Sequence, residues 1–190
     1  MTGKANRFTN RNTIAAIAVL GISACTTQTP VTSRLDSSGL TVVALDDAIV
    51  LARPARKLTV AARDYAYVGP VEINRMGQRE HYLWLGLAST VDRAFADAPA
   101  ADAELLAILV DGQPMTLPLT DWSAELDRAP YETVVPLYAT LSTRASLDQI
   151  QRIAGATSIE VHIISNTRPA AQYRMWQGAW SSWSLFGRAE

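Results

Sequence analysis

The sequence predicts a mainly β fold: an antiparallel β-sandwich, or an antiparallel sheet with one packed helix near residues 146–154. Three observations lead to this expectation. Short apolar runs rich in β-branched residues recur roughly every 8 to 15 residues, turn-forming residues stand between them, and a single segment has a convincing helical pattern. Strictly alternating β–α–β units are absent from the pattern, so we do not expect a doubly wound parallel sheet.

The first apolar runs predict a hairpin. Residues 40–45 and 48–51 are rich in Val, Leu and Ile, and the acidic pair Asp46-Asp47 between them suits a turn. Pro54 ends this piece, and residues 57–62 predict another short strand. We therefore expect short strands joined by tight turns in this part of the chain.

The strongest hairpin prediction covers residues 65–90. Aromatic and β-branched side chains fill residues 65–74, a turn follows at residues 76–78, and residues 80–90 form a long apolar run. The Gly69-Pro70 dipeptide within the first strand indicates a bulge or an edge position.

A second tight hairpin is expected around Asp111-Gly112, because this dipeptide readily adopts positive φ. Residues 104–110 and 115–119 would be its strands, and Pro118 restricts the second of them to an edge or a gap in the ladder. Residues 131–142 predict a further strand that Pro136 interrupts.

Residues 146–155 carry the clearest helix signal. Ser146 suits the N-cap, Gln149 completes a capping box, and Gly155 can end the helix. The apolar residues of the segment form a stripe that a sheet must cover; they are Leu147, Ile150, Ile153 and Ala154. The next segment, residues 158–164, alternates apolar and polar side chains and predicts a half-buried strand.

The C-terminal segment, residues 173–186, holds three of the five tryptophans. Trp176, Trp180 and Trp183 have the i, i+4, i+7 spacing of one helix face. Gly178 and three serines weaken that helix, whereas aromatic and small residues suit a strand packed on its neighbours. We therefore favour a strand over a helix here.

The first 24 residues have the layout of an export signal. A basic start without acidic residues precedes an apolar run from Ile14 through Ile22 and the small residues Ser23 and Ala24. The apolar run is about 10 residues long, whereas a helix that crosses a bilayer needs roughly 20. We therefore expect this segment to be removed rather than to remain as a membrane span.

The tetrapeptide Ile22-Ser23-Ala24-Cys25 resembles the lipobox of bacterial lipoproteins. The resemblance covers only the first 25 residues. It implies cleavage before Cys25, a diacylglyceryl thioether on its sulfur and, usually, acylation of the new amine. Two or three acyl chains anchor a protein durably, since each buried methylene contributes about 0.8 kcal/mol. In this family an Asp after the cysteine favours retention in the inner membrane, so Thr26 implies the outer membrane, facing the periplasm.

Three parts are expected along the chain. Residues 1–24 would be the signal peptide, residues 25–38 the lipidated cysteine and a polar tether, and residues 39–190 a single β-rich domain. Cys25 is the only cysteine, which excludes a disulfide within the chain. Loss of the leader removes three of the 17 basic residues, which changes the net charge from −1 to about −4. This balance does not suit a nucleic-acid-binding domain.

Catalytic and metal-binding motifs are not evident. The two histidines, His81 and His162, lie in predicted strands, and the chain has no closely spaced His or Cys pair. Glu80 precedes His81, but adjacent residues on a strand point to opposite faces, so we do not expect them to act together. No serine stands in a G-x-S-x-G nucleophile motif. We therefore expect no metal, no cofactor and no enzymatic activity.

Aromatic residues supply the candidate binding surface. Arginines flank the two aromatic strands, and Arg with Tyr and Trp is the combination enriched at protein interfaces. Core packing is the alternative role of the same aromatic side chains. The candidate residues are Tyr82, Trp84, Trp176, Trp180 and Trp183.

These observations predict a lipid-anchored bacterial envelope protein that binds a periplasmic protein partner or steadies an envelope assembly. Two alternatives remain open. The tryptophans and aliphatic strands also suit a carrier of lipid or another hydrophobic ligand. Carboxylates together with histidine also suit a hydrolase that acts on envelope material.

Overall fold

Short apolar runs fold into strands as the sequence predicts. The computed structural model describes residues 31–37, 39–54, 62–91, 102–122, 126, 128–178 and 180–187. Within these residues the expected mainly β fold is confirmed. The strands are β1 (Val31–Leu35), β2 (Thr41–Leu45), β3 (Ile49–Pro54), β4 (Arg63–Arg75), β5 (Gln78–Ser89), β6 (Ala103–Val110), β7 (Gln113–Pro118), β8 (Thr120–Asp121), β9 (Leu137–Arg144), β10 (Ile159–Ser165) and β11 (Ala171–Gln177), and the helices are α1 (Leu147–Ala154) and the 3-10 helix η3 (Trp180–Leu185).

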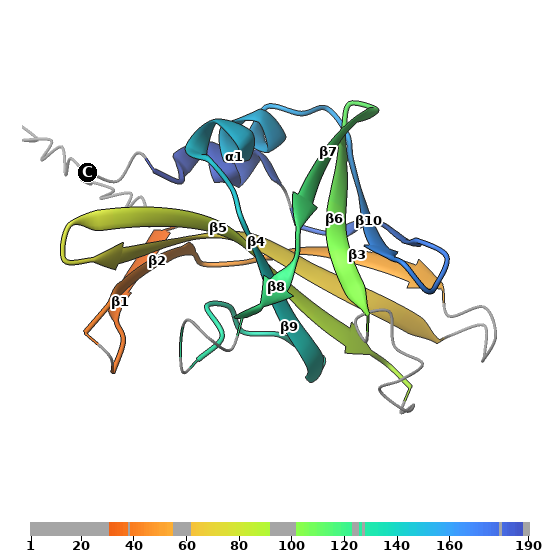
Figure 1. Cartoon of the computed structure of the whole chain (residues 1–190), viewed down its shortest axis with the longest axis horizontal. Coiled ribbons are helices and arrows are strands. Elements are labelled where there is room, and N and C mark those ends of the chain that lie inside the picture. Colours follow the sequence, from red (N-terminus) through yellow and green to blue (C-terminus); the bar gives the residue numbers. More distant parts are fainter. Residues whose placement is uncertain are drawn as a thin grey trace, which may run out of the picture.

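All these strands belong to one antiparallel sheet in the order β7-β6-β10-β11-β3-β4-β5-β9-β8, and β1 and β2 extend it beside β4 (Figure 1). The first and last strands of this order, β7 and β8, are separated in sequence only by Leu119. The sheet therefore nearly closes on itself. Of the two expected forms, the structure has a sheet with one packed α-helix.

The β4–β5 hairpin forms the centre of the fold and is buried on both faces. Its register is continuous from Asp64 paired with Ser89 to Arg75 paired with Gln78. One face packs inside the nearly closed sheet. The segment between β8 and β9 covers the other face, where the Tyr131 hydroxyl donates a hydrogen bond of 2.5 Å to the Pro70 carbonyl.

Gly69-Pro70 occupies a gap in the ladder rather than a bulge. β3 pairs with β4 as far as Val68, and β2 pairs with β4 from Val71 onward. Pro70 therefore stands where its missing N–H leaves no hydrogen bond unmade. A Cβ on Gly69 would collide with the Tyr131 ring, so the glycine permits this close approach.

The hairpin expected around Asp46-Asp47 is wrong. β2 and β3 do not pair with each other; β2 pairs with residues 71–74 of β4, and β3 pairs with residues 63–68. The physical reason is the length of β4, which at 13 residues offers a partner to both short runs in succession. Asp46-Asp47 carries the chain from the second half of β4 to the first half without reversing its direction.

The other local predictions are largely confirmed. Asp111 and Gly112 form the β6–β7 turn with φ of 51° and 79°. Ser146 caps α1, and the capping box with Gln149 is present. β9 begins at Leu137, because Pro136 precedes it and the stretch from residue 131 is used instead to cover the sheet.

The C-terminal strand is shorter than expected. β11 ends at Gln177, and Gly178, with φ of 92°, redirects the chain into η3. The Gln151 side-chain amide donates to the Phe186 carbonyl at 2.9 Å, which fixes η3 and the following turn against α1. The tail therefore combines the strand and helix alternatives.

β1 lies within the segment for which the composition predicts a polar tether. Val31–Leu35 pairs along its length with β2, and Val31 is six residues after Cys25. Cys25 and the expected export signal, residues 1–24, lie outside the described residues, as do residues 57–61 of the expected strand 57–62. Among the described residues no helix is long and apolar enough to cross a membrane.

Candidate functional site

The structure separates the five candidate aromatic residues into core and surface. Tyr82, Trp84 and Trp183 are 3%, 0% and 1% exposed, so their assignment to a binding surface is wrong. β5 is covered on both faces, and Trp183 packs where η3 meets α1. Trp180 is half-buried and donates its indole N–H to the Ala156 carbonyl at 2.8 Å. Trp176 is 54% exposed.

Trp176 is exposed because it belongs to the outward-facing row of β11. Gln172, Arg174 and Trp176 are exposed, whereas Ala171 and Tyr173 between them are buried. Met175 pairs with Leu51 and Gln177 pairs with Val50, so the regular pairing with β3 ends in a bulge at Trp176. The outward face of β11 therefore presents a large aromatic ring to solvent.

Arg63 of β4 holds the exposed indole. Its guanidinium carbon lies 4.7 Å from the centroid of the Trp176 ring, a cation–π contact that contributes about 0.5–1 kcal/mol at an exposed position. Thr90 fixes the backbone of Arg63: the Arg63 N–H donates to the Thr90 hydroxyl at 3.0 Å, and the Thr90 N–H donates to the Arg63 carbonyl at 3.0 Å. The ring and its cation are thus positioned by contacts within the chain.

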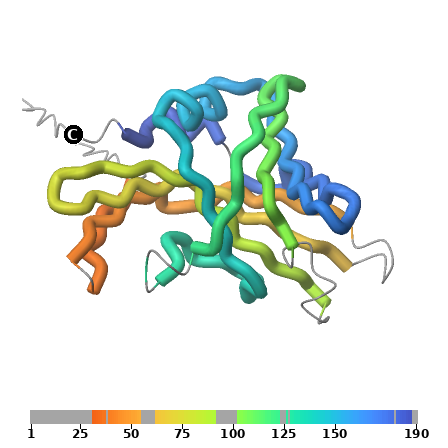
Figure 2. The backbone as a smooth tube through the Cα atoms, viewed as in Figure 1, coloured from red at the N-terminus to blue at the C-terminus, as the bar shows by residue number. Residues whose placement is uncertain are grey.

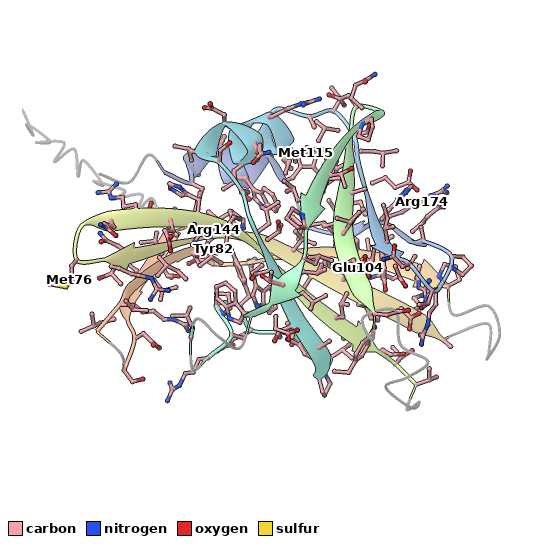
Figure 3. The ribbon with its side chains drawn as sticks, in the orientation of Figure 1. Met76, Tyr82, Glu104, Met115, Arg144 and Arg174 are labelled. Atoms are coloured by element: carbon pink, nitrogen blue, oxygen red, sulfur yellow. The ribbon has the colours of Figure 1, made fainter. Side chains whose placement is uncertain are left out.

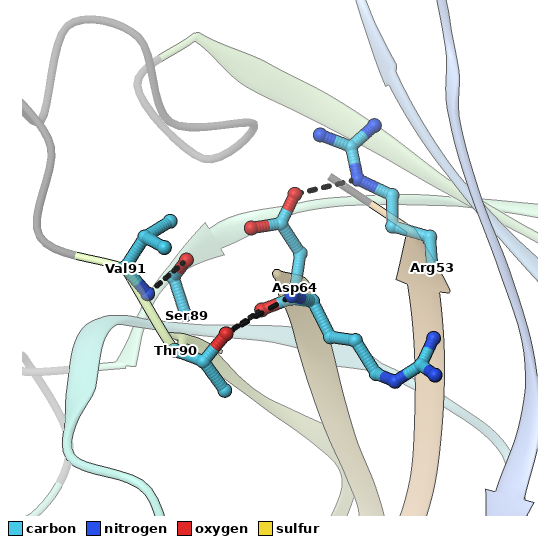
Figure 4. Close-up of polar contacts among 6 residues, drawn as sticks. Arg53, Asp64, Ser89, Thr90 and Val91 are labelled. Atoms are coloured by element: carbon cyan, nitrogen blue, oxygen red, sulfur yellow. Dashed lines mark hydrogen bonds and ion pairs between the residues drawn. The ribbon is translucent and has the colours of Figure 1, made fainter. Parts of the chain in front are cut away.

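The next residue, Asp64, points to the opposite face and forms a buried ion pair. Its carboxylate is fully buried and accepts a hydrogen bond from the Arg53 Nε at 3.0 Å (Figure 4). The Arg53 guanidinium also lies 5.4 Å from the centre of the Tyr173 ring. Removing one partner of a buried pair typically costs about 3–5 kcal/mol, so Arg53 and Asp64 hold this end of β3 and β4 together.

Arg174 extends the exposed region along β11. It stands two residues before Trp176, and its side chain is 82% exposed. Its Nε lies 3.7 Å from a Glu160 carboxylate oxygen on β10, and His162 lies 3.3 Å from the same oxygen. We call Trp176, Arg63 and Arg174 the Trp176 surface.

A second charged cluster lies toward the tip of the β4–β5 hairpin. Glu80 accepts a hydrogen bond from the Tyr82 hydroxyl at 3.0 Å and lies 2.8 Å from Arg144 and 3.6 Å from Arg75. The Tyr82 hydroxyl, with further help from the two arginines, lowers the pKa of the Glu80 carboxyl. Glu80 is therefore held in its charged form, which does not suit a general acid at neutral pH.

Glu80 and His81 point to opposite faces, as expected from strand geometry. His81 instead lies 3.2 Å from Glu72, its cross-strand neighbour on β4. Arg79 lies 3.7 Å from the same carboxylate, and the Phe186 ring packs edge-on against the imidazole. Within the described part of the chain, no three His, Cys, Asp or Glu side chains are grouped so as to hold a metal ion.

Arg63 and the Arg53–Asp64 pair are not predicted by the sequence pattern. The only sign of these contacts in the sequence is that charged residues stand at the ends of two strands. Most solvent-exposed strand ends carry charged residues, so this pattern does not single out these three. The bulge at Trp176 also has no sequence signature, because it is defined by pairing with β3. Only the three-dimensional register reveals that a residue from β4 covers an indole from β11.

Comparison of the chain with protein-family models, with curated proteins and with solved structures finds no match. Its function must therefore be inferred from its own residues and their geometry.

Proposed function

We propose that this chain is a lipid-anchored protein of the bacterial envelope, held at the outer membrane through Cys25, which binds a periplasmic protein partner and catalyses no reaction. The lipobox-like tetrapeptide supports the anchor. The exposure of Trp176 carries the binding function, because Trp84, Trp122 and Trp183 are at most 2% exposed in the same domain. The partner docks on the Trp176 surface.

The chemistry of this surface suits a protein. Tryptophan and arginine are the residues most enriched among those that dominate binding energy at protein interfaces. Arg63 already orients the indole, so little conformational freedom is lost when a partner covers it. Two cationic side chains beside one aromatic ring favour a partner with an apolar contact bordered by carboxylates.

The two alternatives receive less support. A carrier of a hydrophobic ligand would need space between the sheet and α1. Large, fully buried side chains occupy the core there, among them Tyr173, Trp183 and Phe186. The Glu72–His81 pair is the arrangement nearest to an acid–base pair. Arg79 and Phe186 engage these two residues in contacts that suit a structural role.

In-cell photo-crosslinking tests the partner surface. A photoreactive amino acid at position 176 is expected to give an adduct with one defined protein, and Arg63→Ala is expected to reduce its yield. The same probe at Val134, which is 96% exposed, is the control and should give no such adduct. Equal adducts from positions 176 and 134 would contradict the proposed surface.

Fractionation tests the anchor. Replacing Cys25 with Ser removes the acylated sulfur. Residues 25–190 with this change, exported behind a signal peptide that the general signal peptidase removes, should leave the membrane fraction while the domain remains folded by circular dichroism. Retention of the Cys25→Ser protein in membranes washed with high salt would exclude anchoring through this residue.

A further inference from the structure

Met76 stands at the tip of the β4–β5 hairpin as a large apolar residue with no packing role. It is 104% exposed, and Figure 3 shows it at the extreme end of the molecule. Its φ is 52° and that of Gly77 is 93°, so both turn residues are left-handed. Asn or Asp adopts the first of these positions at lower cost than Met. Neither the turn nor the core accounts for a methionine here.

The tip is also rigid, so the exposure of Met76 is a fixed feature of the fold. The Gly77 N–H donates to the Asn74 side-chain oxygen at 2.8 Å, and the two strands pair directly up to Arg75 and Gln78. The flanking Arg75 and Arg79 have ion-pair distances of 3.6 and 3.7 Å to Glu80 and Glu72. The apolar side chain is therefore presented on a firm support between two ion pairs, whose arginine side chains are 40% and 46% exposed.

A second exposed apolar residue lies at the same end. Leu35, which is 75% exposed, pairs with Thr41 of β2, and Thr41 pairs with Asn74 of β4. Leu35 is therefore level with Asn74 in the sheet and two strands away from it, and Asn74 precedes Met76 by two residues. Figure 2 shows the β1–β2 turn and the β4–β5 tip at one end of the molecule, with the β10–β11 connection at the other.

The length of chain between Cys25 and β1 determines which part of the domain an anchored Cys25 holds at the membrane. Six residue steps separate Cys25 from Val31, and an extended chain spans at most about 3.6 Å per step, or roughly 20 Å in all. Val31 is four strand residues from Leu35, about 13 Å. The end that carries Leu35 and Met76 is therefore within reach of the bilayer surface.

We propose that this end of the sheet is a membrane-contact surface, in which Met76 and Leu35 enter the boundary between lipid headgroups and acyl chains while Arg75 and Arg79 face anionic headgroups. This inference rests on the proposed anchoring through Cys25. Exposed apolar residues backed by arginines are the combination that binds such a boundary. The contact orients the domain, which a lipid anchor alone does not.

Site-specific fluorescence tests this orientation. Cys25 is the only cysteine, so in the mature acylated protein Met76→Cys supplies a single free thiol. The labelled protein is reconstituted into vesicles of phosphatidylethanolamine and phosphatidylglycerol that contain a nitroxide-labelled lipid. A polarity-sensitive dye at position 76, or at position 35 in Leu35→Cys, is expected to shift its emission to the blue and to be quenched. The same dye in Val134→Cys, an equally exposed position, should do neither.

The results distinguish this inference from the anchor itself. Protein that floats with the vesicles, yet shows the same emission at positions 76, 35 and 134, would overturn the contact surface and leave the anchor intact. Protein that fails to float would overturn both. A blue shift at position 76 that grows with protein concentration in the absence of vesicles would indicate self-association and would also overturn the inference. Met76→Asn, which suits the turn, is expected to weaken quenching at position 35.

Discussion

Replacing Trp183 with Ala is expected to destabilise the domain far more than replacing Trp176 with Ala. Trp183 is 1% exposed, and burying a tryptophan removes about 150–250 Å² from water, which corresponds to about 4–6 kcal/mol as an upper estimate. Measured truncations of core aromatic residues typically cost about 3–5 kcal/mol. Trp176 is already 54% exposed, so its loss should cost about half as much, roughly 2 kcal/mol, including its contact with Arg63.

Urea unfolding of the mature Cys25→Ser protein, followed by far-ultraviolet circular dichroism, measures the difference. For a slope of about 2 kcal/mol per molar urea, Trp183→Ala should lower the midpoint by roughly 2 M, and Trp176→Ala by about 1 M. Trp183→Phe is the matched control. It keeps most of the buried apolar surface and removes an indole N–H that has no hydrogen-bond partner within the described residues. Equal losses for the two alanine variants would refute the division into core and surface.

Three further predictions concern local features of the fold. Ser146→Ala should lower the unfolding free energy by about 1 kcal/mol, because the capping box with Gln149 is lost; thermal unfolding measures this change. Gly86→Ala should cost about 1–3 kcal/mol, since its Cβ would overlap the Trp84 ring, and a urea midpoint unchanged from wild type would contradict this packing. Hydrogen bonds from the Thr157 hydroxyl and then the Ser158 backbone lower the pKa of the Asp111 carboxyl below its ordinary value of 3.8. The charged carboxylate therefore stabilises the fold above pH 3.8, and this stabilisation is lost as the pH falls through the lowered pKa. Unfolding curves of Asp111→Asn should therefore depend less on pH in that acid range than those of wild type.

Local signals made some elements predictable from the sequence alone. The helix at residues 147–154 follows from the N-cap Ser146 and its capping box with Gln149, which act within one helical turn. The turn at Asp111-Gly112 follows from the tendency of these two residues to adopt positive φ. The alternation of residues 159–163 likewise places its apolar side chains inside. Each of these features depends on neighbours in the sequence, so one chain contains the necessary information.

Long-range pairing made other features unpredictable. The two short runs after residue 40 have the same composition whether they pair with each other or with successive halves of β4, and only the length and position of β4 decides between these arrangements. Trp84 and Trp176 stand in similar sequence surroundings. Their opposite exposure arises because the segment around Tyr131 covers β5 at Trp84, whereas Trp176 lies on the exposed face of β11.

The same strand, β4, connects the two surfaces that we propose. Arg63 at its start holds Trp176, and Arg75 at its end supports the Met76 tip. Twelve strand steps separate these arginines, a path of about 40 Å. If the Met76 end lies on the bilayer, the Trp176 surface points away from the membrane and faces the periplasm, where a soluble partner or the periplasmic part of another envelope protein can reach it. Because β4 is buried on both faces along most of its length, it is stiff enough to keep this separation constant. If both proposed surfaces are correct, the length of the hairpin sets the distance between the membrane and the bound partner.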